Sequence, residues 1–144
     1  MKPVLLDTGV IVALLDRRER YHAQCVDIVE SLERPLVSCE AVIVESCYLL
    51  RALPGASQTV IQNIKQGVIQ IPFQLSQSAA AVETLLRKYR DLPTSLADVS
   101  LIVLADQLNT GDILTLDRDF LTYRWRRNRP FQLLVEFSGE ELGE

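Results

Sequence analysis

The apolar residues of the chain fall into short runs with two different spacings. Apolar stretches of four or five residues predict strands at 3–6, 35–39, 68–72, 112–116 and 131–135. Apolar positions three and four residues apart predict helices at 10–15, 21–32, 40–53, 57–66, 76–89 and 94–109. Because strands alternate with helices, the pattern indicates an α/β fold with a mainly parallel sheet.

Turn-forming and capping residues set the ends of these elements. Pro54 and Gly55 form a strong breaker pair, which ends the preceding helix at residue 53. Ser76 or Ser78 is expected to cap the helix that follows. Residues 118–121 are expected to form one short helical turn between the last two strands.

The composition is that of one ordinary globular domain. The chain has 144 residues, of which 24% are charged and 48% are apolar. No apolar stretch reaches the roughly 18 residues of a membrane span, and the N-terminus lacks the pattern of a signal peptide. We therefore expect a cytoplasmic protein with no membrane partner, a single domain at 1–136 and an acidic, mobile tail at 137–144. Its cysteines, Cys25, Cys39 and Cys47, form no Cys-x-x-Cys pair and are expected to be buried and reduced.

Two acids stand where predicted strands end. Asp7 lies between a buried strand and a helix and is followed by Thr8; Asp117 ends another strand, two residues after Thr115. The carboxyl ends of parallel strands meet at one edge of a sheet, which is where ligands bind in open α/β folds. We expect Asp7 and Asp117 to converge there. The alternative is that they, or Thr8 or Asp119, only cap the helical segments that follow.

Two further acids lie on predicted helices. Glu45 has apolar residues three and four positions away and is expected to project from the apolar face, where a lone carboxylate is costly unless paired or bound to a metal. A rim position or a salt bridge to Arg51 would also explain it. Asp98 stands at the head of a buried helix face, although Ser95-x-x-Asp98 is also close to a capping box.

Four carboxylates around one point favour a divalent cation. They repel one another, and one of them would take up a proton unless a cation neutralised the group. Mg²⁺ prefers one or two carboxylates together with waters and substrate phosphate, and can lower the pKa of an attacking water. The sequence lacks the residues that other hydrolytic mechanisms need. His22 is the only histidine and is expected on the surface, and there is no glycine-rich phosphate loop.

Residues 5–9 (LLDTG) and 115–120 (TLDRDF), the chain length and the order of the four acids resemble those of PIN-domain ribonucleases, close to the VapC-type toxins of prokaryotic toxin–antitoxin pairs. The likeness covers nearly the whole chain. It implies a three-layer α/β/α sandwich around a five-stranded, mainly parallel sheet. It also implies an Mg²⁺- or Mn²⁺-dependent endoribonuclease site built from four carboxylates: Asp7, Glu45, Asp98 and Asp117.

Within such a site the side chains would have different tasks. We expect Asp7 and Asp98 to be direct metal ligands. Thr8 and Thr115 are auxiliary hydroxyls that orient a metal-bound water or a carboxylate, and Asp119 is an auxiliary acid for which capping is the simpler role. Many members of the family carry Ser or Asn at the position of Gly9, so we assign that position no role.

Basic residues suggest how RNA would be held. The net charge is −4, but 11 of the 15 Lys and Arg fall in 17–20, 87–90 and 118–129. Such clusters can attract an anion locally, or can be solvated helix ends. In the last cluster aromatic rings alternate with bases, which suits single-stranded RNA through stacking and phosphate contact. The RNA-binding candidates are Arg124, Arg126 and Arg127. Alternatively, Trp125 packs in the core and the arginines are merely solvated.

The resemblance also implies partners. It implies a homodimer, and an antitoxin whose Arg or Lys enters the carboxylate cluster and competes with the metal. Helices 40–53 and 57–66 carry more apolar residues than one sheet face need bury, and an exposed remainder would serve as an interface. The alternative is a monomer in which these residues are all core.

Two other functions fit parts of the sequence. A PIN-like module that binds RNA or protein without cutting would keep the same acids. An aspartyl-nucleophile phosphatase also uses an Asp after the first strand, but such enzymes resemble Asp-x-Asp and this chain has Gly9 at the second position.

Overall fold

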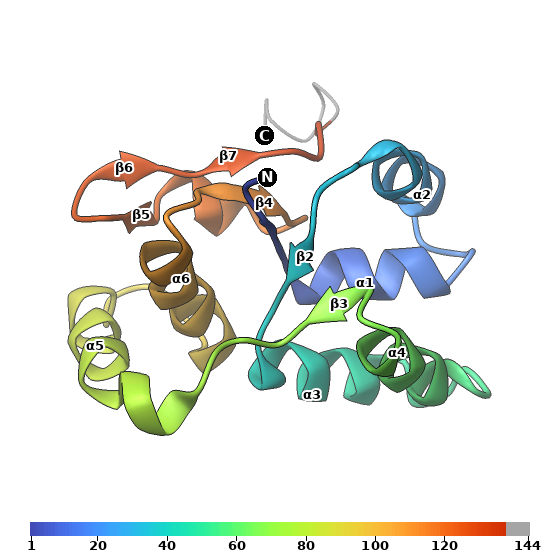
Figure 1. Ribbon diagram of the computed structural model, residues 1–144, viewed down its shortest axis with the longest axis horizontal. Helices are drawn as coiled ribbons and strands as arrows, with labels where there is room; N and C mark the ends of the chain where they lie inside the picture. The colour runs from blue at the N-terminus through green and yellow to red at the C-terminus, as the bar shows by residue number, and fades with distance from the viewer. Residues whose placement is uncertain (138–144) are drawn as a thin grey trace.

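A five-stranded parallel sheet forms the centre of the molecule (Figure 1). The computed structural model of the chain describes residues 1–137. Neighbouring strands of the sheet all pair in parallel, in the order β3-β2-β1-β4-β7. Its strands are β1 (Val4–Leu6), β2 (Leu36–Val37), β3 (Ile69–Gln70), β4 (Asp112–Leu114) and β7 (Gln132–Leu133). The predicted parallel sheet is confirmed, with strands shorter than the apolar runs suggested.

Within residues 1–137, six α-helices flank the sheet and complete the three-layer sandwich. Figure 1 shows α5 and α6 on one side and α1, α2 and α4 on the other, while α3 contacts both α1 and α6. The helices are α1 (Thr8–Leu15), α2 (His22–Ser31), α3 (Glu40–Leu49), α4 (Ala56–Lys65), α5 (Leu75–Lys88) and α6 (Leu96–Leu108), and a short 3₁₀ helix, η1, spans Arg118–Leu121. The predicted helical turn at 118–121 is therefore present.

Some helix ends differ from the predicted ones. Helix α1 begins at Thr8 rather than at residue 10, because the Asp7 side chain accepts a hydrogen bond from the first helical N–H. Helix α3 ends at Leu49, before the breaker pair. The predicted cap of α5 is wrong, because Gln74 occupies the cap position and both Ser76 and Ser78 lie inside the helix. The Ser78 hydroxyl accepts a hydrogen bond from Gln107 at 2.9 Å.

An antiparallel hairpin between η1 and β7 was not predicted. It pairs β5 (Arg124–Trp125) with β6 (Arg129–Pro130). Its turn places Arg126 and Arg127 at φ angles of 43° and 71°, a conformation usually taken by Gly or Asn. Trp125 is buried against Gly111, where a Cβ atom would overlap the indole ring. The hairpin is thereby fastened to the start of β4.

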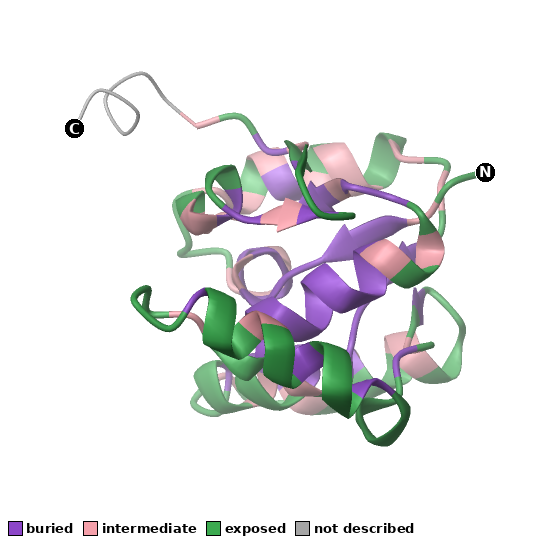
Figure 2. Cartoon of the chain, turned by 90° about the vertical axis from the view of Figure 1, so that its left-hand side faces the viewer, coloured by how far each residue is buried: buried purple, intermediate pink, exposed green. Residues whose placement is uncertain are grey.

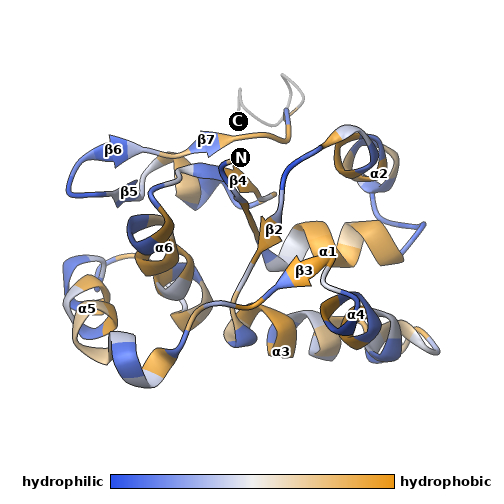
Figure 3. Ribbon diagram, in the orientation of Figure 1, coloured by the Kyte–Doolittle hydropathy of each residue, from blue (hydrophilic) through white to orange (hydrophobic). Residues whose placement is uncertain are grey.

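The core is centred on the sheet and α6. Residues 97–105 of α6 are all buried, since this helix lies between α3 and α5 (Figure 2). Figure 3 shows that the central β2, β3 and α1 are mainly hydrophobic, whereas β6, at the upper left, is hydrophilic. Among residues 1–137 no helix has the length and apolarity needed to cross a membrane.

The single histidine and one of the cysteines are placed differently from what the sequence predicted. His22 is half-buried rather than on the surface, with Nδ1 2.6 Å from the carbonyl oxygen of Ala13. All three cysteines are free, and two are buried; Cys47 is half-buried. The tail expected at 137–144 lies outside the described residues except for Phe137, whose ring packs edge-on to Tyr21 at 6.2 Å between centroids.

Candidate active site

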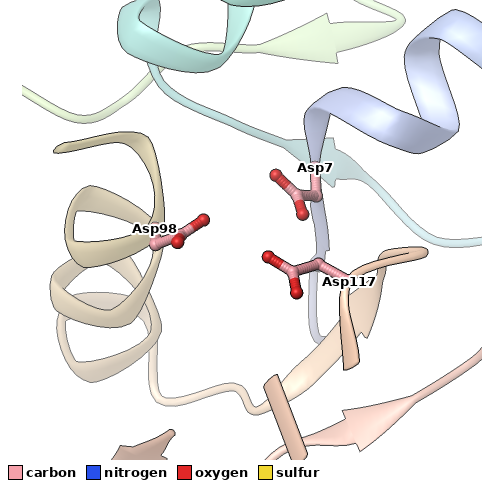
Figure 4. A group of neighbouring side chains, drawn as sticks. All are labelled: Asp7, Asp98 and Asp117. Atoms are coloured by element: carbon pink, nitrogen blue, oxygen red, sulfur yellow. The ribbon is translucent and has the colours of Figure 1, made fainter. Parts of the chain in front are cut away.

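Three aspartates converge at the carboxyl edge of the sheet (Figure 4). Asp7 follows β1, and Asp117 lies three residues after the end of β4. These strands are neighbours, with Leu6 opposite Leu114, so their carboxyl ends lie side by side. Asp98 approaches from the first turn of α6. Each carboxylate offers one oxygen within 4.8 Å of the other two.

Asp7 is held from two directions. Its Oδ1 accepts a hydrogen bond from the Thr8 N–H at 2.8 Å, and its Oδ2 accepts one from the Thr115 hydroxyl at 2.7 Å. Thr115 is fully buried and also accepts a hydrogen bond from the Asp117 N–H at 3.0 Å. Asp7 therefore both caps α1 and belongs to the group of converging acids. Thr115 links the ends of β1 and β4 through its hydrogen bonds.

Asp98 is both a cap and a site residue. The Ser95 hydroxyl accepts from the Asp98 N–H at 3.1 Å, and Asp98 Oδ2 accepts from the Ser95 N–H at 3.3 Å, which completes a capping box. The same Oδ2 accepts a hydrogen bond from the Tyr123 hydroxyl at 3.1 Å. This contact was not predicted from the sequence. A buried tyrosine needs a partner for its hydroxyl, and that requirement is the signal that could have revealed it.

Asp117 caps the short helix η1, and Asp119 does not. The Asp119 N–H donates to Asp117 Oδ1 at 2.9 Å. The expectation that Asp119 acts as the cap is therefore corrected, because the cap is the residue that directly precedes the first helical turn. The Asp119 carboxylate lies near enough to raise the pKa values of both Asp98 and Asp117 by repulsion.

Glu45 lies at the rim of the site rather than on a buried face. The buried residues of α3 include Val42, Ile43 and Ser46, so the apolar side of this helix is rotated away from Glu45, which is exposed. Glu45 still lines the same hollow and repels Asp117. It is not one of the three acids whose oxygens come within 4.8 Å of one another.

Burial and repulsion from neighbouring carboxylates raise the pKa values of all three aspartates. Burial, and then repulsion from Asp98 and Asp117, raise the pKa of Asp7 from 3.8 to about 6, against the lowering effect of its hydrogen bonds. Burial also raises the pKa of Asp98 and of Asp117. The Thr8 hydroxyl beside them is buried with no hydrogen-bond partner among residues 1–137. Clustered carboxylate oxygens and an unpaired hydroxyl fit a divalent cation.

The three aspartates, Glu45 and Thr8 surround an open hollow. Its volume is about 250 Å³, and Gly9, Leu49 and Leu116 complete its lining. This space admits an ion, its waters and a phosphate group, but it does not enclose a folded ligand.

The family-model scan matches the PIN domain over residues 4–125. The chain belongs to the PIN-domain family. Ribonuclease VapC26 of Mycobacterium tuberculosis (strain ATCC 25618 / H37Rv) is 32% identical over 120 residues, which cover 80% of this chain and 87% of that protein. The crystal structure of Mycobacterium tuberculosis VapC20, described as a sarcin–ricin loop cleaving toxin, matches with a TM-score of 0.75 and 18% identity, over 88% of this chain and 99% of that one. This second likeness shows the fold.

The residues that line the hollow of this PIN domain do not include the arginines proposed to bind RNA. The Arg124 guanidinium donates to the carbonyl oxygens of residues 121–123 and is half-buried. Arg126 and Arg127 are exposed, and the Arg126 N–H is bound by Asp106. Asp106 lies eight residues after Asp98 on α6, about 12 Å along the helix axis. Trp125 packs in the core, as the alternative interpretation held.

Without metal, this PIN domain should lose stability as the pH rises. Asp7 is protonated in both states below its ordinary pKa of 3.8, and the native state must bury a charge as the pH passes about 6. The stability that the neutral Asp7 carboxyl contributes is fully present below pH 3.8 and is lost as the pH rises to about 6. We expect the free energy of unfolding to fall by about 1 kcal/mol between pH 5 and pH 7.5, measured by urea denaturation with chelator present.

Asp7→Asn should reduce this pH dependence and make the metal-free protein more stable than wild type at pH 7.5. Asp27→Asn, which changes an exposed acid on α2, is the control and should leave the dependence unchanged. A wild-type protein that becomes more stable from pH 5 to pH 7.5 would contradict the assignment of a buried, repelled carboxylate.

Proposed function

We propose that this PIN domain is a metal-dependent endoribonuclease and the toxin of a toxin–antitoxin pair, acting in the cytoplasm. The observation that carries the proposal is the convergence of Asp7, Asp98 and Asp117, in a chain that is 32% identical to a named VapC ribonuclease. Family membership also weighs against the aspartyl-nucleophile phosphatase, as does Gly9 in the lining of the hollow.

The proposed chemistry divides the work among the acids. Asp7 and Asp98 would hold Mg²⁺ or Mn²⁺, with Asp117 close to both. When bound, such an ion polarises a scissile phosphate and lowers the pKa of an attacking water. Thr115 keeps Asp7 in place through its 2.7 Å hydrogen bond, and the unpaired Thr8 hydroxyl is available to orient a water. Glu45, exposed at the rim, is the acid best situated to accept a proton from water entering from solvent.

The proposed substrate is single-stranded or looped RNA, because the open hollow admits a phosphate of a flexible strand. Asp119 would act as an auxiliary acid at its edge. Arg126 and Arg127 would contact the RNA backbone at a distance from the scissile phosphate, since both are exposed in the hairpin turn. Arg124 would contribute less, because its guanidinium is bound to backbone carbonyl groups.

An apolar surface beside the site supports a homodimer. On α3, Val44, Tyr48 and Leu49 are 69%, 61% and 52% exposed, and Ile61 on α4 is 53% exposed. Leu96, in the first turn of α6, extends this surface, and Glu45 borders it. Large exposed apolar patches mark interaction sites. A second copy across this patch would bring two acidic hollows close together.

An antitoxin is proposed as the regulator. The hollow carries three aspartates whose mutual repulsion a cation relieves, so an Arg or Lys of a partner protein could take the place of the metal. Inhibition by such a partner should weaken as the Mn²⁺ concentration rises.

The metal-binding proposal is tested by thermal unfolding. Millimolar Mn²⁺ or Mg²⁺ should raise the Tm of the wild-type protein, because an ion that binds only the folded state stabilises it. Asp7→Asn and Asp98→Asn should abolish the rise, whereas Asp27→Asn should keep it. A Tm that does not respond to Mn²⁺ would count against the site.

The catalytic proposal is tested with an end-labelled single-stranded RNA. Internal cleavage should require Mn²⁺ or Mg²⁺ and should fall about 10²-fold or more in Asp7→Ala, the scale of losing one preorganised electrostatic group. Glu45→Gln, Asp98→Asn and Asp117→Asn should also be impaired. Binding without cleavage would favour the non-catalytic module, and cleavage that survives excess chelator would exclude the mechanism.

The dimer is tested by light scattering at micromolar concentration. The wild-type mass should be twice that of one chain, and Val44→Glu should yield monomers because it puts a charge into the apolar patch. Leu86→Glu, which alters an exposed apolar residue on α5, is the matched control and should stay dimeric. A wild-type monomer would refute the proposal.

A further inference from the structure

Tyr123 is buried, and its hydroxyl reaches one of the three aspartates. The hydroxyl donates to Asp98 Oδ2 at 3.1 Å and lies 3.0 Å from the Thr94 hydroxyl. Tyr123 has no exposed surface, while Asp98 and Thr94 both lie nearer to solvent. The Tyr123 hydroxyl therefore contacts the Asp98 carboxylate from the interior of the protein.

The direction of these hydrogen bonds follows from the donors available. An ionised carboxylate only accepts, so the single proton of the Tyr123 hydroxyl points to Asp98. The Thr94 hydroxyl then donates its proton to the phenol oxygen. A chain of donors runs from Thr94 through Tyr123 to Asp98, and each bond in such a chain strengthens the next.

The ring of Tyr123 is fixed by packing. Tyr89 and Phe120 contact it edge-on, with ring centroids 4.9 Å and 5.0 Å away. The hydroxyl therefore stays in place. Oδ2 accepts the hydrogen bonds from the Ser95 N–H and the Tyr123 hydroxyl, so these two donors together set the orientation of the Asp98 carboxylate.

We propose that Tyr123 is a positioning residue for the metal site, which it serves by holding Asp98 Oδ2 and thereby fixing the orientation in which this carboxylate meets the ion. This inference rests on the proposed function, because it presupposes that Asp98 binds a metal. Tyr123 touches neither substrate nor ion and acts only through Asp98. Residues that orient a metal ligand typically change metal affinity 10- to 100-fold when their hydrogen bond is removed.

The test compares two buried tyrosines, of which Tyr123 donates a hydrogen bond to Asp98 and Tyr89 accepts one from the Arg124 N–H. Tyr123→Phe removes the hydroxyl that contacts Asp98 and keeps the ring. Tyr89→Phe removes a neighbouring buried hydroxyl, which accepts a hydrogen bond from the Arg124 N–H at 3.0 Å and does not contact the acids. Equilibrium Mn²⁺ binding, followed through the paramagnetic signal of free Mn²⁺, should show Kd raised about 10-fold in Tyr123→Phe and nearly unchanged in Tyr89→Phe.

A second measurement separates positioning from general damage. The Mn²⁺ concentration that gives half-maximal RNA cleavage should rise in Tyr123→Phe, and the rate at saturating Mn²⁺ should return to near the wild-type value. Equal Mn²⁺ affinity in wild type and Tyr123→Phe would overturn the inference. Wild-type protein that binds no Mn²⁺ would instead overturn the proposed function on which it rests.

If Tyr123→Phe does not fold, Thr94 decides the question. Thr94→Val removes the hydroxyl that donates to the phenol, and Thr94→Ser keeps it. We expect weaker Mn²⁺ binding in Thr94→Val and wild-type binding in Thr94→Ser. Equal affinity in these two variants would then overturn the inference.

Discussion

The parallel pairing of β1 with β4 is the interaction on which the site depends. It sets Leu6 opposite Leu114, so the chain leaves both strands at the same edge of the sheet. Asp7 follows the first strand at once, and Thr115 follows the second. The 2.7 Å hydrogen bond from the Thr115 hydroxyl to Asp7 then links the carboxyl ends of the two strands. A shift of one residue in this register would turn Thr115 to the opposite face and separate the acids.

The charges gathered at this edge are tolerated because each of the three aspartates lies at or near the start of a helical segment and accepts a hydrogen bond from a backbone N–H there. Asp7 caps α1, Asp117 caps η1 and Asp98 completes the capping box of α6. Backbone N–H groups that would otherwise lack partners bind carboxylates that would otherwise be poorly solvated. This support is incomplete, since the pKa of Asp7 still rises to about 6. Capping and metal binding were separate interpretations of the sequence, and in the folded chain the same side chains can serve both.

The sheet and the convergence of Asp7 with Asp117 could be predicted because they depend on local pattern and on one topological rule, whereas Asp98 was predicted from its place at the head of a buried helix face. Buried strands are apolar without alternation, and parallel strands end at one edge. Glu45 could not be placed in the same way, because the rotation of α3 depends on its packing against both α1 and α6. The β5–β6 hairpin escaped prediction because its turn puts Arg126 and Arg127 at positive φ, where a sequence usually has Gly or Asn.

The segment that follows η1 carries both the arginines proposed to bind RNA and the tyrosine that contacts Asp98. Its arginines suggested RNA contact, yet side chains along an extended chain alternate between two faces. Trp125 packs against Gly111, so that side of the chain faces the interior. Tyr123, two residues earlier, faces the same way and reaches Asp98. Arg124 falls on the other face, where its guanidinium donates to the carbonyl oxygens of residues 121–123, and Arg126 lies beyond the strand in the hairpin turn.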